Sequence, residues 1–164
     1  MDRDARYYLG QHEEVWKILC DAGIIMLDGD ACELHGIGFA DVKGFGGGFG
    51  QWALQPWGET TTKQFVHEAV NEAVDLESAL AKLRTPQRIV VLHSIFAFLG
   101  SSRLEEPLNR YAVTAVCHGH AHHGSPEGQT TAGVPVYNVA VPLLHKTYPD
   151  RLPFRLVEIP VTPQ

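Results

Sequence analysis

The chain has 164 residues, of which 45% are hydrophobic and 20% charged, and its formal net charge is −6. These values are ordinary for one globular domain, so residues 1–164 are treated as a single domain. The excess of acidic residues argues against general binding to nucleic acid and against a polybasic membrane anchor. No apolar run approaches the roughly 20 residues that a membrane-spanning helix needs.

The cysteines and the first residues indicate where the protein works. Cys20, Cys32 and Cys117 are odd in number and form no CxxC pair, which argues against a disulfide framework or a thiolate zinc site. Residues 1–9 are charged and aromatic and lack the continuous apolar core of a signal peptide. A cytoplasmic, reducing location is therefore predicted.

Hydrophobic spacing predicts the elements of the first half of the chain. A helix is expected over 13–22, ended by Gly23, followed by a short strand over 24–27. A turn at 28–30 leads to a second strand over about 32–40, and the glycine-rich segment 44–50 predicts a mobile surface loop. The longest helix is expected over 60–83, because its apolar residues recur on one face.

The second half of the chain predicts a buried parallel sheet. Residues 88–92 and 112–117 form continuous apolar runs, which are typical of strands covered on both faces. A helix over about 104–111 separates them, and a right-handed crossover of this length favours parallel pairing. Two final strands are expected over 134–141 and 154–159. The order of elements predicts an α/β fold.

Histidine follows both of these parallel strands. His93 comes directly after 88–92, and the hexapeptide 118–123 (HGHAHH) comes directly after 112–117. Ligands of open α/β sheets gather beyond the carboxyl ends of the strands. In an extended segment, histidines two residues apart point to the same side. The sequence therefore predicts a divalent-metal site of His93, His120 and His122, of a kind suited to Mn, Fe, Zn, Ni or Co.

These same residues resemble a known family. Val91-Leu92-His93 and Gly119-His120-Ala121-His122 resemble the last two motif blocks of the calcineurin-like metallophosphoesterases, and 36–40 and 136–140 resemble flanking strands. The resemblance implies a partial αββα sandwich with mixed sheets. It also implies that His93 and His120 bind one metal and His122 a second, and that a metal-activated water attacks a phosphomonoester or phosphodiester.

The chain departs from the family pattern in its first half. The family's DxH, GDxxD and GNH blocks are not found; residues 29–33 and 10–13 resemble the last two only superficially and in reverse order. Three neutral imidazoles cannot bridge two dications, and residues 94–98 lack the proline-containing loop usual after the first histidine. The chain can therefore be an enzyme fragment, one half of a split enzyme completed by a partner chain, or a non-catalytic protein with one metal ion. Homo-oligomerisation is a further expectation.

A rival enzyme class is the histidine-triad nucleotide hydrolases, because His118, His120 and His122 alternate as in that motif. The small fillers between them do not match it, and that chemistry uses no metal. Around the predicted site, Asn138 is expected to support it from a neighbouring strand, with His118 turned away from the ions. Cys117 is expected in the core of its strand, and His123 is expected either to support the site or to be structural. His35, His67 and His145 are expected on the surface or as hydrogen-bonded core residues.

Overall fold

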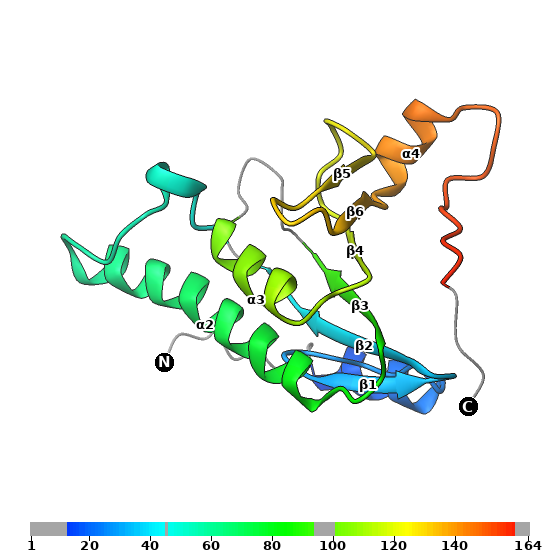
Figure 1. Cartoon of the computed structure of the whole chain (residues 1–164), viewed down its shortest axis with the longest axis horizontal. Coiled ribbons are helices and arrows are strands. Elements are labelled where there is room, and N and C mark those ends of the chain that lie inside the picture. The colour runs from blue at the N-terminus through cyan, green and yellow to red at the C-terminus, as the bar shows by residue number, and fades with distance from the viewer. Residues whose placement is uncertain (1–12, 45, 94–100, 160–164) are drawn as a thin grey trace.

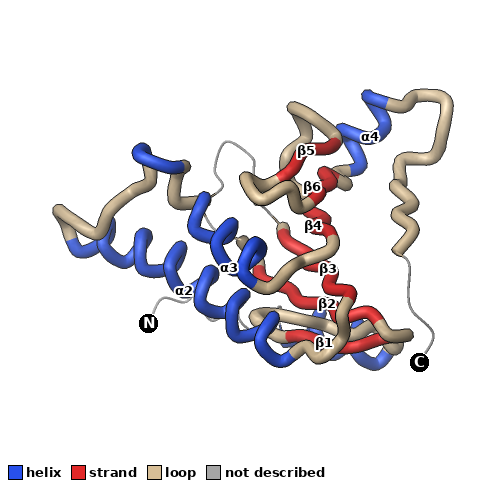
Figure 2. The backbone as a smooth tube through the Cα atoms, in the orientation of Figure 1, coloured by secondary structure: helices blue, strands red, loops and turns tan. Residues whose placement is uncertain are grey.

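The computed structural model describes residues 13–44, 46–93 and 101–159, and these residues form an α/β fold. Six strands of this part of the chain make one mixed sheet in the order β1-β2-β3-β4-β6-β5 (Figures 1 and 2). The four central strands are parallel, and the two edge strands are antiparallel to their neighbours. The strands are β1 Ala31–Leu34, β2 Ile37–Val42, β3 Gln87–Leu92, β4 Ala115–His118, β5 Glu127–Gln129 and β6 Pro135–Asn138.

Four helices accompany the sheet within the described residues. They are a helix over 13–21, α2 Thr60–Lys82, α3 Glu105–Arg110 and α4 Val141–Thr147, with short 3-10 turns η1 Gly50–Trp52 and η2 Ser102–Leu104. The predicted helices over 13–22, 60–83 and 104–111 are confirmed. Gly23 ends the first helix with a φ of 80°, and Gly23 and Ile24 donate backbone bonds to Cys20 and Leu19. This pair of bonds is the Schellman ending that glycine favours.

The hydrophobic core lies between the sheet and the two helices α2 and α3. Alternate residues of the central strands, such as Ala40, Val90 and Val116, point to this side and are fully buried. They pack against Leu76 and Leu80 of α2 and against residues of η2 and α3. Because β2-α2-β3 and β3-α3-β4 are successive crossovers between neighbouring parallel strands, both helices cover the same face (Figure 1).

The opposite face of the sheet carries the other set of alternating residues. Phe39 and Asp41 of β2 and Val91 of β3 line an open pocket of about 360 Å³ there, and Val91 is 42% exposed. Parallel strands are normally buried on both faces. This face is therefore less covered than the continuous apolar pattern of 88–92 predicts.

Two predicted strands of the first half need correction. Residues 24–27 form no strand, and the single strand expected over 32–40 is a hairpin of β1 and β2. His35 and Gly36 form its turn with φ values of 50° and 79°, the pattern of a type I′ turn. The sequence does not indicate this turn, because Leu34 and Ile37, on either side of it, continue the apolar pattern.

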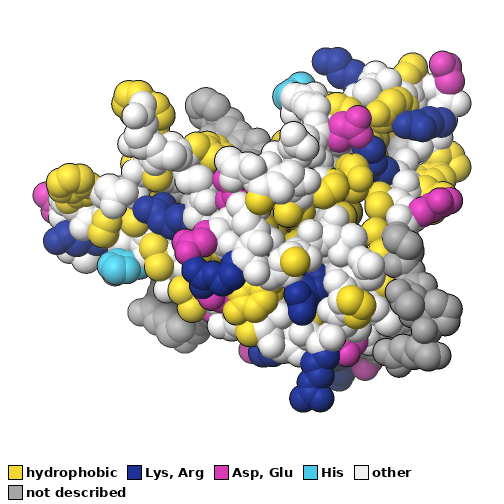
Figure 3. Space-filling model, in the orientation of Figure 1, with side chains coloured by type: hydrophobic (Ala, Val, Ile, Leu, Met, Phe, Trp, Pro, Cys, Tyr) yellow, Lys and Arg dark blue, Asp and Glu magenta, His cyan; other side chains and the backbone are white. Residues whose placement is uncertain are grey.

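The last predicted strand is also wrong. Residues 154–159 make no ladder with the sheet in the described part of the chain. The tail is held to β6 through Arg155, whose guanidinium lies 4.1 Å from the centre of the Tyr137 ring. Figure 3 shows hydrophobic side chains gathered at the upper right, around α4 and the tail, where Leu152, Phe154 and Leu156 are exposed.

The α/β class is confirmed: the described residues contain one six-stranded mixed sheet and four helices, of which α2 and α3 cover one face of the sheet. A complete αββα sandwich has two sheets, and the described residues form one, so the αββα arrangement stays a prediction. No helix in the described part of the chain is long and apolar enough to cross a membrane.

Candidate metal centre

The structure brings together two of the three predicted metal ligands. His93 follows β3 and His120 follows β4, and their ring centroids are 4.7 Å apart with an interplanar angle of 61°. The two strands are parallel neighbours in which Leu92 pairs with His118, so their carboxyl ends meet at one edge of the sheet. Both residues are exposed, which leaves their ring nitrogens accessible to an ion.

His120 sits in a tight backbone turn. Its φ is 59°, and the Ala121 N–H donates to the Gly119 carbonyl at 2.7 Å. A bond between residues two apart across a positive φ is a strained γ-turn. Such a backbone costs about 1–3 kcal/mol at a non-glycine residue and is concentrated at functional sites.

This turn corrects the reasoning that placed His122. β4 ends at His118, so the segment 119–122 is not extended and alternation does not apply to it. His122 and His123 are exposed in the loop. Within the described residues, no group of three or more His, Cys, Asp or Glu side chains is arranged to hold a metal ion. His122 as a ligand stays a prediction.

His118 contacts the backbone of this turn. Its Nδ1 lies 3.0 Å from the Gly119 carbonyl, the same oxygen that accepts from Ala121. The Gly119 N–H donates to the Leu92 carbonyl at 3.2 Å, which ties the turn to β3. Burial lowers the pKa of His118 below its ordinary value, and the bond to Gly119 acts in the opposite direction. His118 is buried and is not one of the two paired rings, and its expected orientation away from the ions stays a prediction.

Asn138 of β6 holds the other end of the turn. Its side-chain Nδ2 donates to the Ala121 carbonyl at 2.8 Å, and its Oδ1 accepts from the Ala140 N–H at 3.1 Å. The residue is only 3% exposed, and both bonds define which way the amide points. Asn138 therefore lies beside the candidate site, on a neighbouring strand, and it bonds to the backbone of the turn.

Carboxylates gather at a separate place that the sequence did not indicate. Asp28, Glu72 and Asp75 line a polar pocket of about 300 Å³ together with Lys43. Lys43 pairs with Asp28 at 3.1 Å, and its carbonyl accepts from the His93 N–H at 3.1 Å. Lys43 therefore offsets part of this charge and links the end of β2 to the backbone of the ring pair.

Asp41 is the most perturbed carboxylate of this region. Burial and the charges of Asp28 and Glu72 raise the pKa of Asp41 from 3.8 to about 6, and Lys43 opposes the shift. Its place in the alternation of β2, between buried Ala40 and Val42, puts it on the less covered sheet face. In the sequence, Asp41 stands out as a charged residue within an otherwise apolar strand.

The weak motif matches in the first half do not join the ring pair. Asp30 bonds to Lys82 at 2.7 Å and to the backbone of Ala31 at 2.8 Å, as a residue of a turn would. His12 and residues 94–98 lie outside the described residues.

Two neutral imidazoles at this spacing are a chemically suitable donor pair for a borderline divalent cation, with metal–nitrogen bonds of about 2.0–2.1 Å in the case of zinc. Comparison with known proteins assigns no function to this site. No family model matches the chain, and no curated protein sequence matches it.

Proposed function

We propose that this chain is the metal-binding, histidine-bearing part of a calcineurin-like phosphoesterase, which hydrolyses a phosphomonoester or phosphodiester in the cytoplasm. The observation that carries the proposal is the pairing of the His93 and His120 rings at the ends of neighbouring parallel strands. In open α/β sheets this is where ligands bind.

Each residue has a defined task in this proposal. His93 and His120 bind the divalent cation (Mn, Fe, Zn, Ni or Co), and His122 approaches from the exposed loop to complete the site. When bound, the cation supplies an activated water and offsets the charge that develops on the phosphate. His118 and Asn138 hold the turn that presents His120.

A second chain is part of the proposal. In the described part of the chain no carboxylate joins the ring pair to form a group of three ligands, so a second cation would need ligands from elsewhere. The less covered sheet face at Phe39 and Val91 supports a complementing chain or a second copy of this one. Hydrolysis is therefore expected to depend on assembly more strongly than metal binding does.

Calorimetric titration of Mn²⁺ and Zn²⁺ tests the metal site. We expect His93→Ala to weaken binding at least about tenfold, a loss of roughly 1.4 kcal/mol. His67→Ala, an exposed histidine of α2, is the matched control and should bind like the wild type. Equal affinity of the two variants would rule out the ring pair as the site.

Hydrolysis of aryl phosphate monoesters and diesters with added Mn²⁺ tests the activity. Turnover that is abolished by a chelator supports the phosphoesterase. Metal binding without turnover, at every protein concentration, assigns the chain to the non-catalytic metal-binding proteins. Turnover that survives the chelator favours the metal-free histidine-triad chemistry instead.

A further inference from the structure

The less covered sheet face, opposite α2 and α3, carries one carboxylate that has no partner in the described part of the chain. Asp41 of β2 lines the pocket of about 360 Å³ on this face, and its side chain makes no hydrogen bond or ion pair with a described residue. The charge of Lys43 acts on Asp41, but the Lys43 ammonium pairs with Asp28 at 3.1 Å. A half-buried carboxylate without a partner favours a cation from outside.

The other walls of this pocket are mostly apolar. They consist of one thiol and six apolar side chains, namely Cys32 and Ile25, Met26, Leu27, Leu34, Phe39 and Val91. A cation that reaches Asp41 therefore also contacts apolar surface. Lysine and arginine meet both demands, because they carry their charge at the end of an aliphatic stem.

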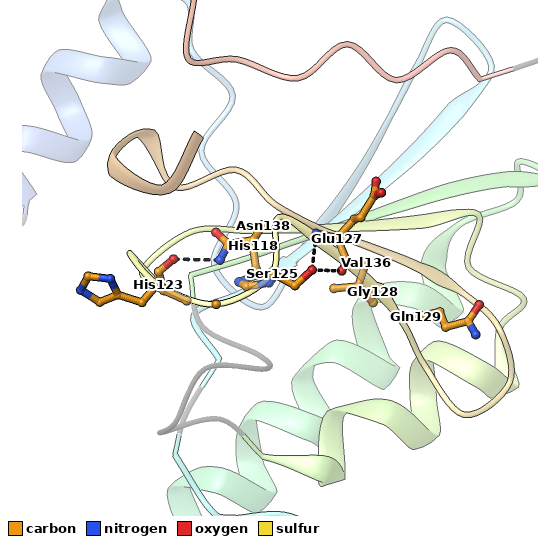
Figure 4. A pocket seen from close by; sticks show the side chains of 10 residues that line it. His118, His123, Ser125, Glu127, Gly128, Gln129, Val136 and Asn138 are labelled. Carbon is orange, nitrogen blue, oxygen red and sulfur yellow. Dashed lines mark hydrogen bonds between the residues drawn. The ribbon is translucent and has the colours of Figure 1, made fainter. Parts of the chain in front are cut away.

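Two other pockets on the described surface differ in this respect. In the pocket of about 280 Å³ beside the turn of His120, the Glu127 carboxylate is paired with the Arg155 guanidinium, and the Ser125 hydroxyl donates to the Glu127 carbonyl (Figure 4). The polar pocket of about 300 Å³ contains the cation of Lys43 itself. Of these three pockets, the one at Asp41 combines an unpaired carboxylate with apolar walls.

The open shape of this pocket indicates a protein chain as the source of the cation. A small-molecule site encloses most of the surface of its ligand, whereas Ile25, Leu34 and Val91 stay exposed around this pocket. Exposed apolar surface of this kind is typical of protein–protein contacts. A second copy docked face to face is disfavoured, because each copy carries a net charge of −6 and the two Asp41 carboxylates would approach one another.

We propose that the less covered sheet face docks a segment of another protein chain in which a lysine or arginine lies among apolar residues, with its cation against Asp41. The proposal rests on the proposed function in one respect, since the complementing chain of that function supplies the segment. It adds the chemistry by which that chain is recognised. Docking itself requires no metal.

Calorimetric titration of the metal-free protein with two blocked peptides tests the proposal. Both peptides alternate valine and threonine around one central residue, which is lysine in the first and norleucine in the second. Norleucine keeps the aliphatic stem and lacks the charge. We expect the lysine peptide to bind at least about tenfold more tightly. Equal affinity of the two peptides, or no binding of either, would overturn the proposal.

Asp41→Asn shows whether this carboxylate causes the preference. The variant should bind both peptides with equal affinity, because the amide keeps the shape of the side chain and removes its charge. Asp75→Asn is the matched control, since Asp75 is an exposed carboxylate that lines the neighbouring polar pocket. It should prefer the lysine peptide as the wild type does. An equal loss of preference in both variants would reflect net charge alone and would overturn the proposal.

Self-association of the protein is measured alongside by analytical ultracentrifugation. We expect both peptides to act on the monomer. A dimer that excludes both peptides would mean that a second copy covers this face, which would also overturn the proposal.

The two proposals fail separately. Binding of Mn²⁺ or Zn²⁺ that depends on His93, in a protein that does not distinguish the peptides, would keep the metal site and remove the docking surface. A peptide preference that depends on Asp41, in a protein that binds neither metal, would keep the docking surface and remove the phosphoesterase.

Discussion

The imidazole rings of His93 and His120 lie 4.7 Å apart, although each follows a different strand of the sheet. The parallel register that pairs Leu92 with His118 brings them together, because it ends β3 and β4 at the same level. The γ-turn at His120 then directs its ring toward His93, at the expense of a positive φ. The ring pair therefore depends on both the sheet register and a strained turn.

His120→Gly should stabilise the metal-free protein while removing metal binding. Glycine adopts a φ of 59° without the steric penalty that histidine carries. We expect a gain of up to about 1 kcal/mol in the free energy of unfolding, measured by urea denaturation. Metal affinity, measured by titration, should fall at least about tenfold.

His122→Gly is the matched control for this trade-off. His122 has no positive φ, so glycine relieves no strain there and only increases the freedom of the unfolded chain. We expect unchanged or slightly lower stability. A His120→Gly variant that is less stable than His122→Gly would show that the turn is not strained.

The strand ends could be predicted from the sequence because their signals are local. One continuous apolar run ends at Leu92, directly before His93, and another ends at Cys117, and a crossover of sufficient length makes the two strands parallel. Knowing that the strands are neighbours is enough to expect that the residues after them meet. The sequence therefore predicts this part of the candidate site.

The turn itself could not be predicted, because it depends on contacts between distant parts of the chain. Asn138 and Leu92 bind the backbone of 119–121 from two other strands. Without them, a Gly-His-Ala-His segment after a strand is expected to continue extended. The strand predicted over 154–159 is wrong for a related reason. Alternation of apolar residues indicates a strand, but it does not indicate whether a sheet edge is available to pair with that strand.

Asn138→Ala should weaken both the fold and the metal site. The variant leaves the Ala140 N–H and the Ala121 carbonyl without their partners, which costs about 1–3 kcal/mol for a buried group. We expect a lower free energy of unfolding and, at temperatures where the variant remains folded, weaker Mn²⁺ binding.

Asn109→Ala separates these two effects. Asn109 also bonds through its amide, but its partners are Thr130 and Thr131 and not the backbone of the turn. Its loss should reduce stability with no change in metal affinity. If Asn109→Ala weakens metal binding as much as Asn138→Ala does, the loss reflects general destabilisation and Asn138 does not position His120.

Gly38→Ala should destabilise the amino-terminal end of β2. An added Cβ would lie 2.6 Å from Thr85 Oγ1 and 2.9 Å from the methyl groups of Leu83. Overpacking of this kind costs about 1–3 kcal/mol. Gly128→Ala in β5 is the control, because its Cβ meets no atom within 4 Å. Thermal unfolding should show a lower Tm for the first variant and a nearly unchanged Tm for the second.

Asp41→Asn should stabilise the protein above about pH 6 and have little effect below about pH 4. Burial, Asp28 and Glu72 raise the pKa of Asp41 from 3.8 to about 6, so the folded state holds a proton that the unfolded state releases. Below pH 3.8 the carboxyl is neutral in both states. As the pH rises through 6, ionisation of the half-buried carboxyl removes stability, and the neutral amide avoids this loss.

The shift corresponds to a gain of at most about 3 kcal/mol at pH 8, and solvent around the half-buried group makes it smaller. Urea denaturation of both proteins between pH 3.5 and about pH 8 measures it, with Asp150→Asn, an exposed residue near the tail, as the control. A gain that is the same at every pH would mean that ionisation of Asp41 is not its source. A gain that vanishes in an assembled form would show that a partner neutralises Asp41 at the less covered face, since Phe39 and Val91 line the same pocket.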